Sequence, residues 1–355
     1  MSALFILWSA TSFVFEVPSG AWADVVDRRL LLGLSGLAYA AGFACWLVFP
    51  SFAGFAAGFV LWGLASALKS GTFEALVYDE LDGRGQAAQY PRVIGWCESS
   101  AITANLVATV LAAPLMAAGG YALVGWTSVS AALVQAALAT TLPAAAKRTA
   151  RTATTRYLAM LRAGLAEAHG HVDVRRVVAI SSLLLGLTAY DEYFPLVARE
   201  HGVATTVVPV LVGLVVVGQA VGTALVGRTS GQRPATTAAL VAASGVTISL
   251  GALRGDLWGF LAISVGYGLL NNAMLVSEAR LQQVISGPAR ATVTSVVGVT
   301  SEVVGVVVLG VFALAAGVAS VSTLLGVLGV PVVLGSLAVR RWLPPSAAGD
   351  RELGR

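Results

Sequence analysis

Charged residues are scarce in this sequence. Only 11% of its 355 residues are Asp, Glu, Lys or Arg, whereas soluble domains carry about a quarter. Since 57% of the residues are hydrophobic, so little charge could not cover a water-facing surface, and the net charge of +4 is not a signal for nucleic acid. The three histidines show no metal-ligand spacing, and both cysteines, Cys45 and Cys97, lie in apolar runs that do not suggest a disulfide framework. The composition points to lipid as the solvent.

Apolar runs of membrane-crossing length recur along the whole chain, each bounded by charges or turn residues. A membrane β-barrel would show alternating polarity, whereas these runs are apolar on all sides. We therefore predict an all-α membrane protein with about eleven transmembrane helices. The predicted spans are 3–23, 30–49, 51–76, 92–116, 121–142, 176–197, 205–227, 235–253, 256–277, 291–315 and 317–339.

Basic residues are distributed unevenly between the two sides of these spans. Numbering the connections alternately places 19 of the 22 Lys and Arg on one side. Only Arg199 and Arg254 fall on the other side, and Lys69 lies inside a span. Because positive residues concentrate in cytoplasmic loops, we predict a multi-pass protein of the cell membrane with a cytoplasmic C-terminus.

The longest polar stretch divides the chain into two groups of spans, five before it and six after it. We predict an N-terminal helical bundle at 1–142, a cytoplasmic linker at 143–175, a C-terminal bundle at 176–343 and a cytoplasmic tail at 344–355. Two bundles around a central loop are a common plan among transporters.

The connection after the first span holds the most specific motif. Gly20 is followed four residues later by Asp24, and then by the basic pair Arg28 and Arg29. Gly20 would let two helices approach closely, and Asp24 can pair with Arg28 or with a neighbouring helix end. The basic pair would anchor the loop in the cytoplasm, and we expect Glu16 to join this charge network.

This loop resembles the signature of the major facilitator superfamily, where it joins the second and third of twelve spans. Segments 16–19 and 70–79 are similar to stretches of bacterial members, and 222–233 resembles a second copy of the loop that has lost its acid. Where the family has a base after the acid and a glycine before the basic pair, this chain has Val25 and Asp27. In this register the family's first helix is missing, and we expect either an upstream start or a shortened variant.

The resemblance implies a two-bundle secondary active transporter of a small molecule, coupled to protons, and not an enzyme. The expected partners are the substrate, protons and the lipid bilayer; no cofactor, metal or nucleic acid is expected, and the chain should act as a monomer. Residues 105–120 match the glycine- and proline-rich motif of the family's drug–proton antiporters poorly, which weakens the efflux interpretation but leaves it open. The alternative is a non-transporting member, either a sensor or an inactive remnant.

Polar side chains inside spans are costly in lipid and therefore indicate function. Glu302 is the deepest carboxylate, and we expect it to carry the coupling proton; the alternative is a neutral acid hydrogen-bonded to another helix. Asp191 and Glu192, in the outer third of their span, are candidates for substrate or proton contact or for an extracellular gate. The remaining candidates are Glu74 and three amides that could instead only bind helices together: Asn105, Asn271 and Asn272.

Overall fold

The computed structural model describes residues 1–355 except 71, 87–88, 144–169, 285–289 and 346–355. The side chains of residues 16, 17, 20, 21, 24, 25, 91, 98, 290–292 and 295 also lie outside the description. The chain divides into two compact units, Met1–Tyr157 and Leu158–Arg355. The boundary falls within the predicted linker 143–175, most of which lies outside the described residues.

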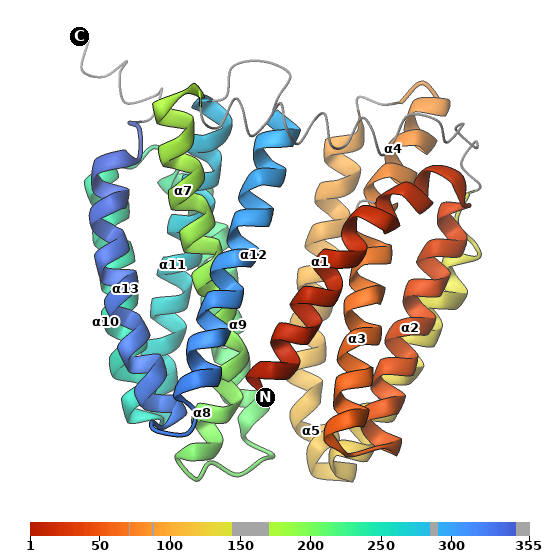
Figure 1. Ribbon diagram of the computed structural model, residues 1–355, viewed down its shortest axis with the longest axis horizontal. Coiled ribbons are helices and arrows are strands. Elements are labelled where there is room, and N and C mark those ends of the chain that lie inside the picture. Colours follow the sequence, from red (N-terminus) through yellow and green to blue (C-terminus); the bar gives the residue numbers. More distant parts are fainter. Residues whose placement is uncertain (71, 87–88, 144–169, 285–289, 346–355) are drawn as a thin grey trace. The chain divides into compact units, whose positions relative to one another are not determined.

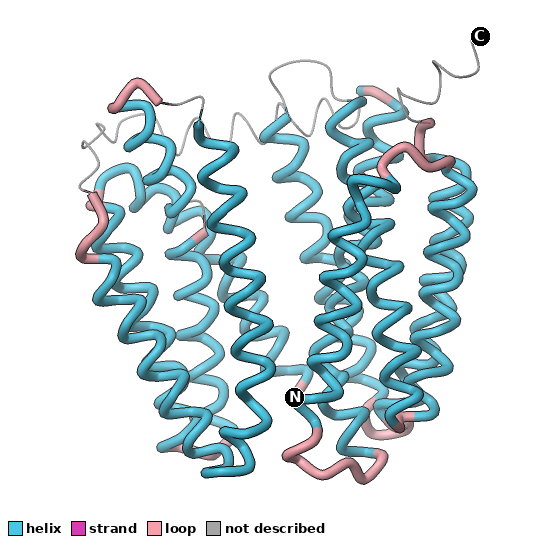
Figure 2. The backbone as a smooth tube through the Cα atoms, turned by 180° about the vertical axis from the view of Figure 1, so that it is seen from behind, coloured by secondary structure: helices cyan, strands magenta, loops and turns pink. Residues whose placement is uncertain are grey.

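Every regular element in the described part of the chain is a helix (Figures 1 and 2). Eight of the helical stretches found there are long and apolar enough to cross a membrane. Lipid offers no hydrogen-bond partners, and a helix satisfies its own backbone groups within one segment. The prediction of an all-α membrane protein is confirmed.

The regular elements in the described residues of unit 1 are all helices (Figure 1). They are α1 (Ser2–Val25), α2 (Arg28–Val48), α3 (Phe52–Lys69), α4 (Thr72–Gly83) and α5 (Tyr90–Ala139). The side chain of Asp27 accepts a hydrogen bond from the backbone N–H of Arg29 and caps α2, and Ser51 caps α3 in the same way. Helix α3 packs against both α1 and α2, and α2 also packs against α5.

Helix α5 is 50 residues long, which corresponds to about 75 Å and far exceeds the bilayer core. At Gly120 the backbone turns to φ 60° and ψ −156°, a conformation that glycine adopts without steric cost. The element therefore consists of two membrane-length halves joined at Gly120. These halves coincide with the predicted spans 92–116 and 121–142.

Unit 2 contains the remaining helices. They are α7 (Val172–Leu187), the 3-10 helix η3 (Thr188–Tyr193), α8 (Phe194–Glu200), α9 (Val208–Thr229), α10 (Pro234–Arg254), α11 (Leu257–Val284), α12 (Arg290–Ala315) and α13 (Val321–Trp342). Helix α11 packs against α7, α9 and α10, while α12 packs against α7 and η3. The predicted span 176–197 is thus not one continuous α-helix, because η3 interrupts it.

Glycines bring α9 and α11 into backbone contact. A Cβ atom added at Gly218 would overlap the carbonyl oxygen of Ser264, and one added at Gly222 would overlap that of Gly268. Such close approach between membrane helices is typical of small residues four positions apart. It places the polar side chains of α11 within hydrogen-bonding reach of α9.

Gly222→Ala should destabilise the protein by about 1–3 kcal/mol, because the added methyl overlaps the backbone of α11. Gly227→Ala is the matched control, since Gly227 lies on the same helix and an added Cβ there would meet no atom within 4 Å. The midpoint of thermal unfolding in detergent should fall for the first variant only. Equal midpoints would show that α9 and α11 are not in backbone contact.

Candidate functional site

Arg28 ties the connection between α1 and α2 to α4. Its side chain is buried, with the residue 9% exposed. Nη1 donates to Asp79 Oδ2 at 2.6 Å and to the carbonyl oxygen of Ala75 at 2.9 Å, while Nε donates to the carbonyl oxygen of Ala23 at 3.2 Å. Arg28 therefore fixes the connection between α1 and α2 to α4.

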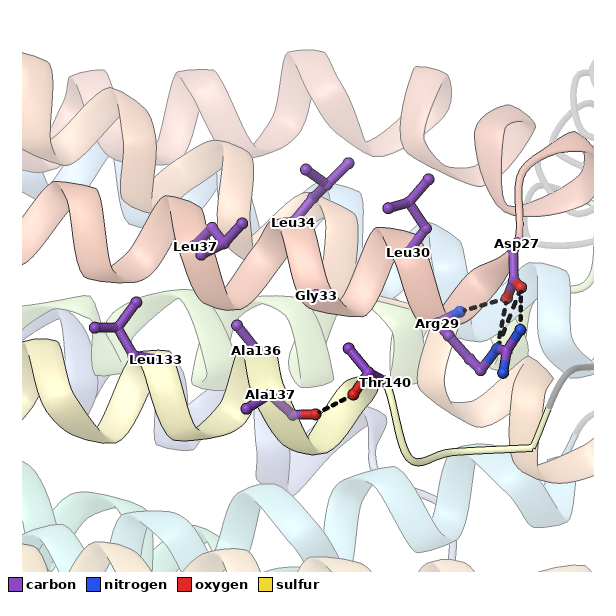
Figure 3. Close-up of a pocket in the computed structure, with 10 residues that line it drawn as sticks. All are labelled: Asp27, Arg29, Leu30, Gly33, Leu34, Leu37, Leu133, Ala136, Ala137 and Thr140. Atoms are coloured by element: carbon purple, nitrogen blue, oxygen red, sulfur yellow. Dashed lines mark hydrogen bonds and ion pairs between the residues drawn. The ribbon is translucent and has the colours of Figure 1, made fainter.

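Arg29, the second base of the motif, has a different partner. Its Nη2 donates to Asp27 Oδ2 at 2.7 Å, and its backbone N–H donates to Asp27 Oδ1 at 2.9 Å (Figure 3). Asp27 stands where the family has glycine, but its φ of −59° requires no glycine. Asp27, which replaces the family's glycine, therefore caps α2 and forms an ion pair with Arg29.

The other motif residues lie at the edge of the description. Glu16, Gly20 and Asp24 belong to α1, and their side-chain placement is outside the described residues. Their roles in the charge network therefore remain predictions.

Arg280 fixes the corresponding connection in unit 2. This residue of α11 is 1% exposed, and its Nη2 donates to the carbonyl oxygens of Ser230 at 2.7 Å and Gln232 at 3.0 Å. Within the described residues, its Nε and Nη1 have no hydrogen-bond partner. The connection between α9 and α10 is thus held by a cation from α11. The sequence had indicated Arg280 only as a base on the cytoplasmic side.

Asp79→Asn should lower the free energy of unfolding by about 3 kcal/mol, because it leaves the buried Arg28 guanidinium without its counter-charge. Glu80→Gln serves as the control. Glu80 pairs with the exposed Arg84 one turn away, and such pairs contribute roughly 0.5 kcal/mol or less.

Thermal unfolding in detergent measures both variants. Because the two groups neutralise each other, Arg28→Gln combined with Asp79→Asn should cost less than the two single changes added together. Strict additivity would mean that Arg28 and Asp79 are not coupled.

Unit 2 holds a carboxylate on η3 bonded to a phenol on α11, a helix long and apolar enough to cross a membrane. Asp191 lies on η3, and its Oδ2 accepts a hydrogen bond of 2.6 Å from the hydroxyl of Tyr267 on α11. The rings of Tyr190, Phe194 and Tyr267 contact one another edge-to-face, with centroids 5.7 to 6.3 Å apart. Among the ion pairs found in the described residues, none involves Asp191. This carboxyl group therefore sits beside an aromatic cluster with a phenol as its partner.

The 3-10 helix explains how Asp191 reaches this position. Tighter winding over Thr188–Tyr193 changes the direction of side chains relative to a continuous α-helix. Tyr190 is fully buried by this arrangement, and within the described residues its hydroxyl has no hydrogen-bond partner. Short 3-10 segments within helices often mark functional hinges.

The other predicted carboxylates lie in different settings. Glu192 is exposed beside Asp191, and Glu302 is exposed on α12, the helix that packs against η3. Glu74 on α4 is half-buried, and one of its carboxylate oxygens, Oε2, is buried without a hydrogen-bond partner in the described part of the chain. Asn105 is exposed on α5.

The amides of Asn271 and Asn272 connect α11 to α9. Asn271 Nδ2 donates to Thr223 Oγ1 at 2.7 Å and to the carbonyl oxygen of Gln219 at 3.3 Å. Asn272 Nδ2 donates to the carbonyl oxygen of Gly222 at 2.9 Å. Both residues are buried, and this geometry agrees with the alternative in which these amides bind helices together.

Two partners were not singled out from the sequence. Tyr267 lies in an apolar span and Asp79 lies just beyond the end of one. In neither case does the distance in sequence between the residue and its partner indicate that the two would bond. A tyrosine within a span does carry a polar hydroxyl that must find an acceptor, which is the signal that could have found Tyr267. The described residues contain no group of three or more His, Cys, Asp or Glu that could hold a metal ion.

Comparison with known proteins identifies the family. A family model described as Major Facilitator Superfamily matches residues 1–309. The chain therefore belongs to the major facilitator superfamily of membrane transporters and is not an enzyme, as the loop motif and the span pattern predicted. No curated protein matches the sequence.

Solved structures share the fold at low sequence identity. The nucleoside transporter NupG superposes with a TM-score of 0.72 at 12% identity, covering 97% of this chain and 90% of that one. A D-xylose-proton symporter gives 0.69 at 15% identity, with coverage of 97% and 88%. An auto-inhibited POT family peptide transporter gives 0.65 at 15%, with coverage of 96% and 87%. At these identities the likeness concerns the fold alone.

Proposed function

We propose that this protein is a proton-coupled transporter of a small polar solute and that Asp191 carries the coupling proton. The observation that supports this most directly is the 2.6 Å bond between Asp191 and Tyr267, which joins η3 to α11, a helix long and apolar enough to cross a membrane. Intramembrane carboxylates commonly mark proton relays. Two of the solved structures with this fold have names that describe sugar–proton symport and peptide transport.

The proposed mechanism uses the charge dependence of this hydrogen bond. A phenol bonds more strongly to an ionised carboxylate than to a neutral carboxylic acid. When Asp191 takes up a proton, its bond to Tyr267 weakens and α11 is held less tightly to η3. Release of the proton restores the bond, so that the proton and the helix arrangement are coupled.

Glu302 is the alternative proton carrier in this proposal. It was the deepest carboxylate in the predicted spans, and its helix packs against η3. Glu192, next to Asp191, would then serve as a gate at the outer end of the span. The Arg28–Asp79 tie, together with Asp24 and Glu16, would hold one conformation of unit 1 and release it during transport.

The orientation in the membrane is part of the same proposal. The excess of Lys and Arg on one side supports a cell-membrane protein with a cytoplasmic C-terminus. Both bundles belong to one chain, and we expect the monomer to transport. Uptake and efflux are both compatible with this mechanism, and the direction of proton movement decides between them.

Asp191→Asn should abolish coupled proton movement, because the amide cannot take up and release a proton. Purified protein would be reconstituted into vesicles containing a pH-sensitive dye, and nucleosides, pentoses and short peptides would be added in turn. Proton flux should accompany the transported compound in the wild type. It should vanish in Asp191→Asn, while downhill exchange of the same compound persists.

Three further variants complete this experiment. Tyr267→Phe should retain coupled flux but with an altered dependence on pH, because the carboxylate loses its donor. Asp173→Asn is the control, since Asp173 is an exposed residue at the start of α7 that pairs with Arg176. Unchanged coupling in Asp191→Asn, with loss of coupling in Glu302→Gln, would transfer the role to Glu302.

A further inference from the structure

An apolar groove runs along unit 1 between α2 and the second half of α5 (Figure 3). Its volume is about 620 Å³. Three leucines of α2, spaced three to four residues apart, form one wall: Leu30, Leu34 and Leu37. They are 55%, 43% and 50% exposed. Both walls belong to helices of membrane-crossing length, so the groove opens along a surface that faces lipid.

Small residues give the groove its depth. Gly33 of α2 faces Ala136 of α5, and a Cβ atom added at Gly33 would lie 3.8 Å from the Ala136 carbonyl oxygen. Ala137 lines the same space and is exposed. The floor is therefore made of backbone and methyl groups, against which an extended hydrocarbon chain can pack.

A charged group closes one end of the groove. Arg29 is about one-third exposed there, paired with Asp27, and its Nη1 donates to the carbonyl oxygen of Leu142 at 3.4 Å. A guanidinium has five N–H donors in a planar fork that matches the oxygens of a phosphate. The bonds to Asp27 and Leu142 do not use all of these donors, so N–H groups remain to bond a phosphate.

The lining offers little to a water-soluble molecule. Apart from Asp27 and Arg29, its polar side chain is Thr140, whose hydroxyl donates to the carbonyl oxygen of Ala137 in its own helix at 2.7 Å. A ligand that matches the whole groove must be apolar along most of its length and anionic at one end. The sequence continues from Leu142 into Lys147, Arg148 and Arg151, and basic residues next to a membrane helix attract anionic lipids.

We propose that this groove is a binding site for an anionic phospholipid of the leaflet on the Arg29 side. One acyl chain lies along Leu30, Leu34 and Leu37, over the floor formed by Gly33 and Ala136. The phosphate bonds to the guanidinium of Arg29 and shares it with Asp27. The site is separate from Asp191 and does not depend on proton coupling.

The proposal can be tested with spin-labelled phospholipids. The full-length protein would be reconstituted into phosphatidylcholine bilayers, and the fraction of immobilised spin label would be compared between phosphatidylglycerol and phosphatidylcholine probes. The wild type should prefer phosphatidylglycerol. Arg29→Gln should reduce this preference about fivefold, the effect of one basic group near an anionic surface. Arg254→Gln is the control, because Arg254 pairs with an aspartate two residues away just as Arg29 does.

A second variant tests the groove itself. Ala137→Phe fills the groove from an exposed position and should reduce immobilisation of both probes, whereas Ala131→Phe, at an exposed position of α5 outside the groove, should not. An undiminished preference in Arg29→Gln, or undiminished immobilisation in Ala137→Phe, would overturn the proposal. So would a change of oligomeric state in Ala137→Phe without loss of lipid, because the groove would then be an interface between copies of the chain.

Discussion

Polar groups that lose water within lipid must find partners inside the protein, and this constraint shapes both units. The helices satisfy their own backbones, and the buried side chains then connect one helix to another. Arg28 bonds to Asp79, Asn272 bonds to the backbone of α9, and Tyr267 bonds to Asp191. Each of these contacts joins elements that are distant in sequence and gives a buried polar side chain a partner.

The two units fix their equivalent loops in opposite ways. In unit 1 the cation belongs to the loop, since Arg28 reaches the carboxylate of Asp79 on α4. In unit 2 the cation belongs to the helix, since Arg280 of α11 reaches loop carbonyl oxygens. A guanidinium forms weaker hydrogen bonds to neutral backbone carbonyl oxygens than to an ionised carboxylate. The segment that resembles a second copy of the loop thus has a tie of a different kind.

Hydropathy was sufficient to predict most of the helices, because a span needs about 20 apolar residues whatever its neighbours are. Of the eleven predicted spans, 3–23 and 176–197 fall outside the eight stretches of the described residues that are long and apolar enough to cross a membrane. Only one of the two interruptions was predicted. The break at Gly120 falls between the predicted spans 92–116 and 121–142 and was therefore expected. The 3-10 winding at Thr188–Tyr193 was not, because six residues leave no periodic pattern.

The residues that bond to the candidate site residues could not be predicted either, because they lie far away in the sequence. Asp191 was recognised as costly in lipid, but Tyr267 lies 76 positions away, and the packing of α11 against α7, the helix that leads into η3, brings them together. Arg280 looked like any other base at a helix end, although its burial makes it a structural contact. The loop motif was predicted because its residues are neighbours in sequence.

The central claim is that Asp191 gains and loses a proton while bonded to Tyr267. Infrared difference spectroscopy of the protein in bilayers, recorded as the pH is changed, measures this directly through the carbonyl stretch of a protonated carboxyl group. The account predicts one such band that is absent in Asp191→Asn and is shifted in frequency in Tyr267→Phe. A band that remains unchanged in both variants would contradict it.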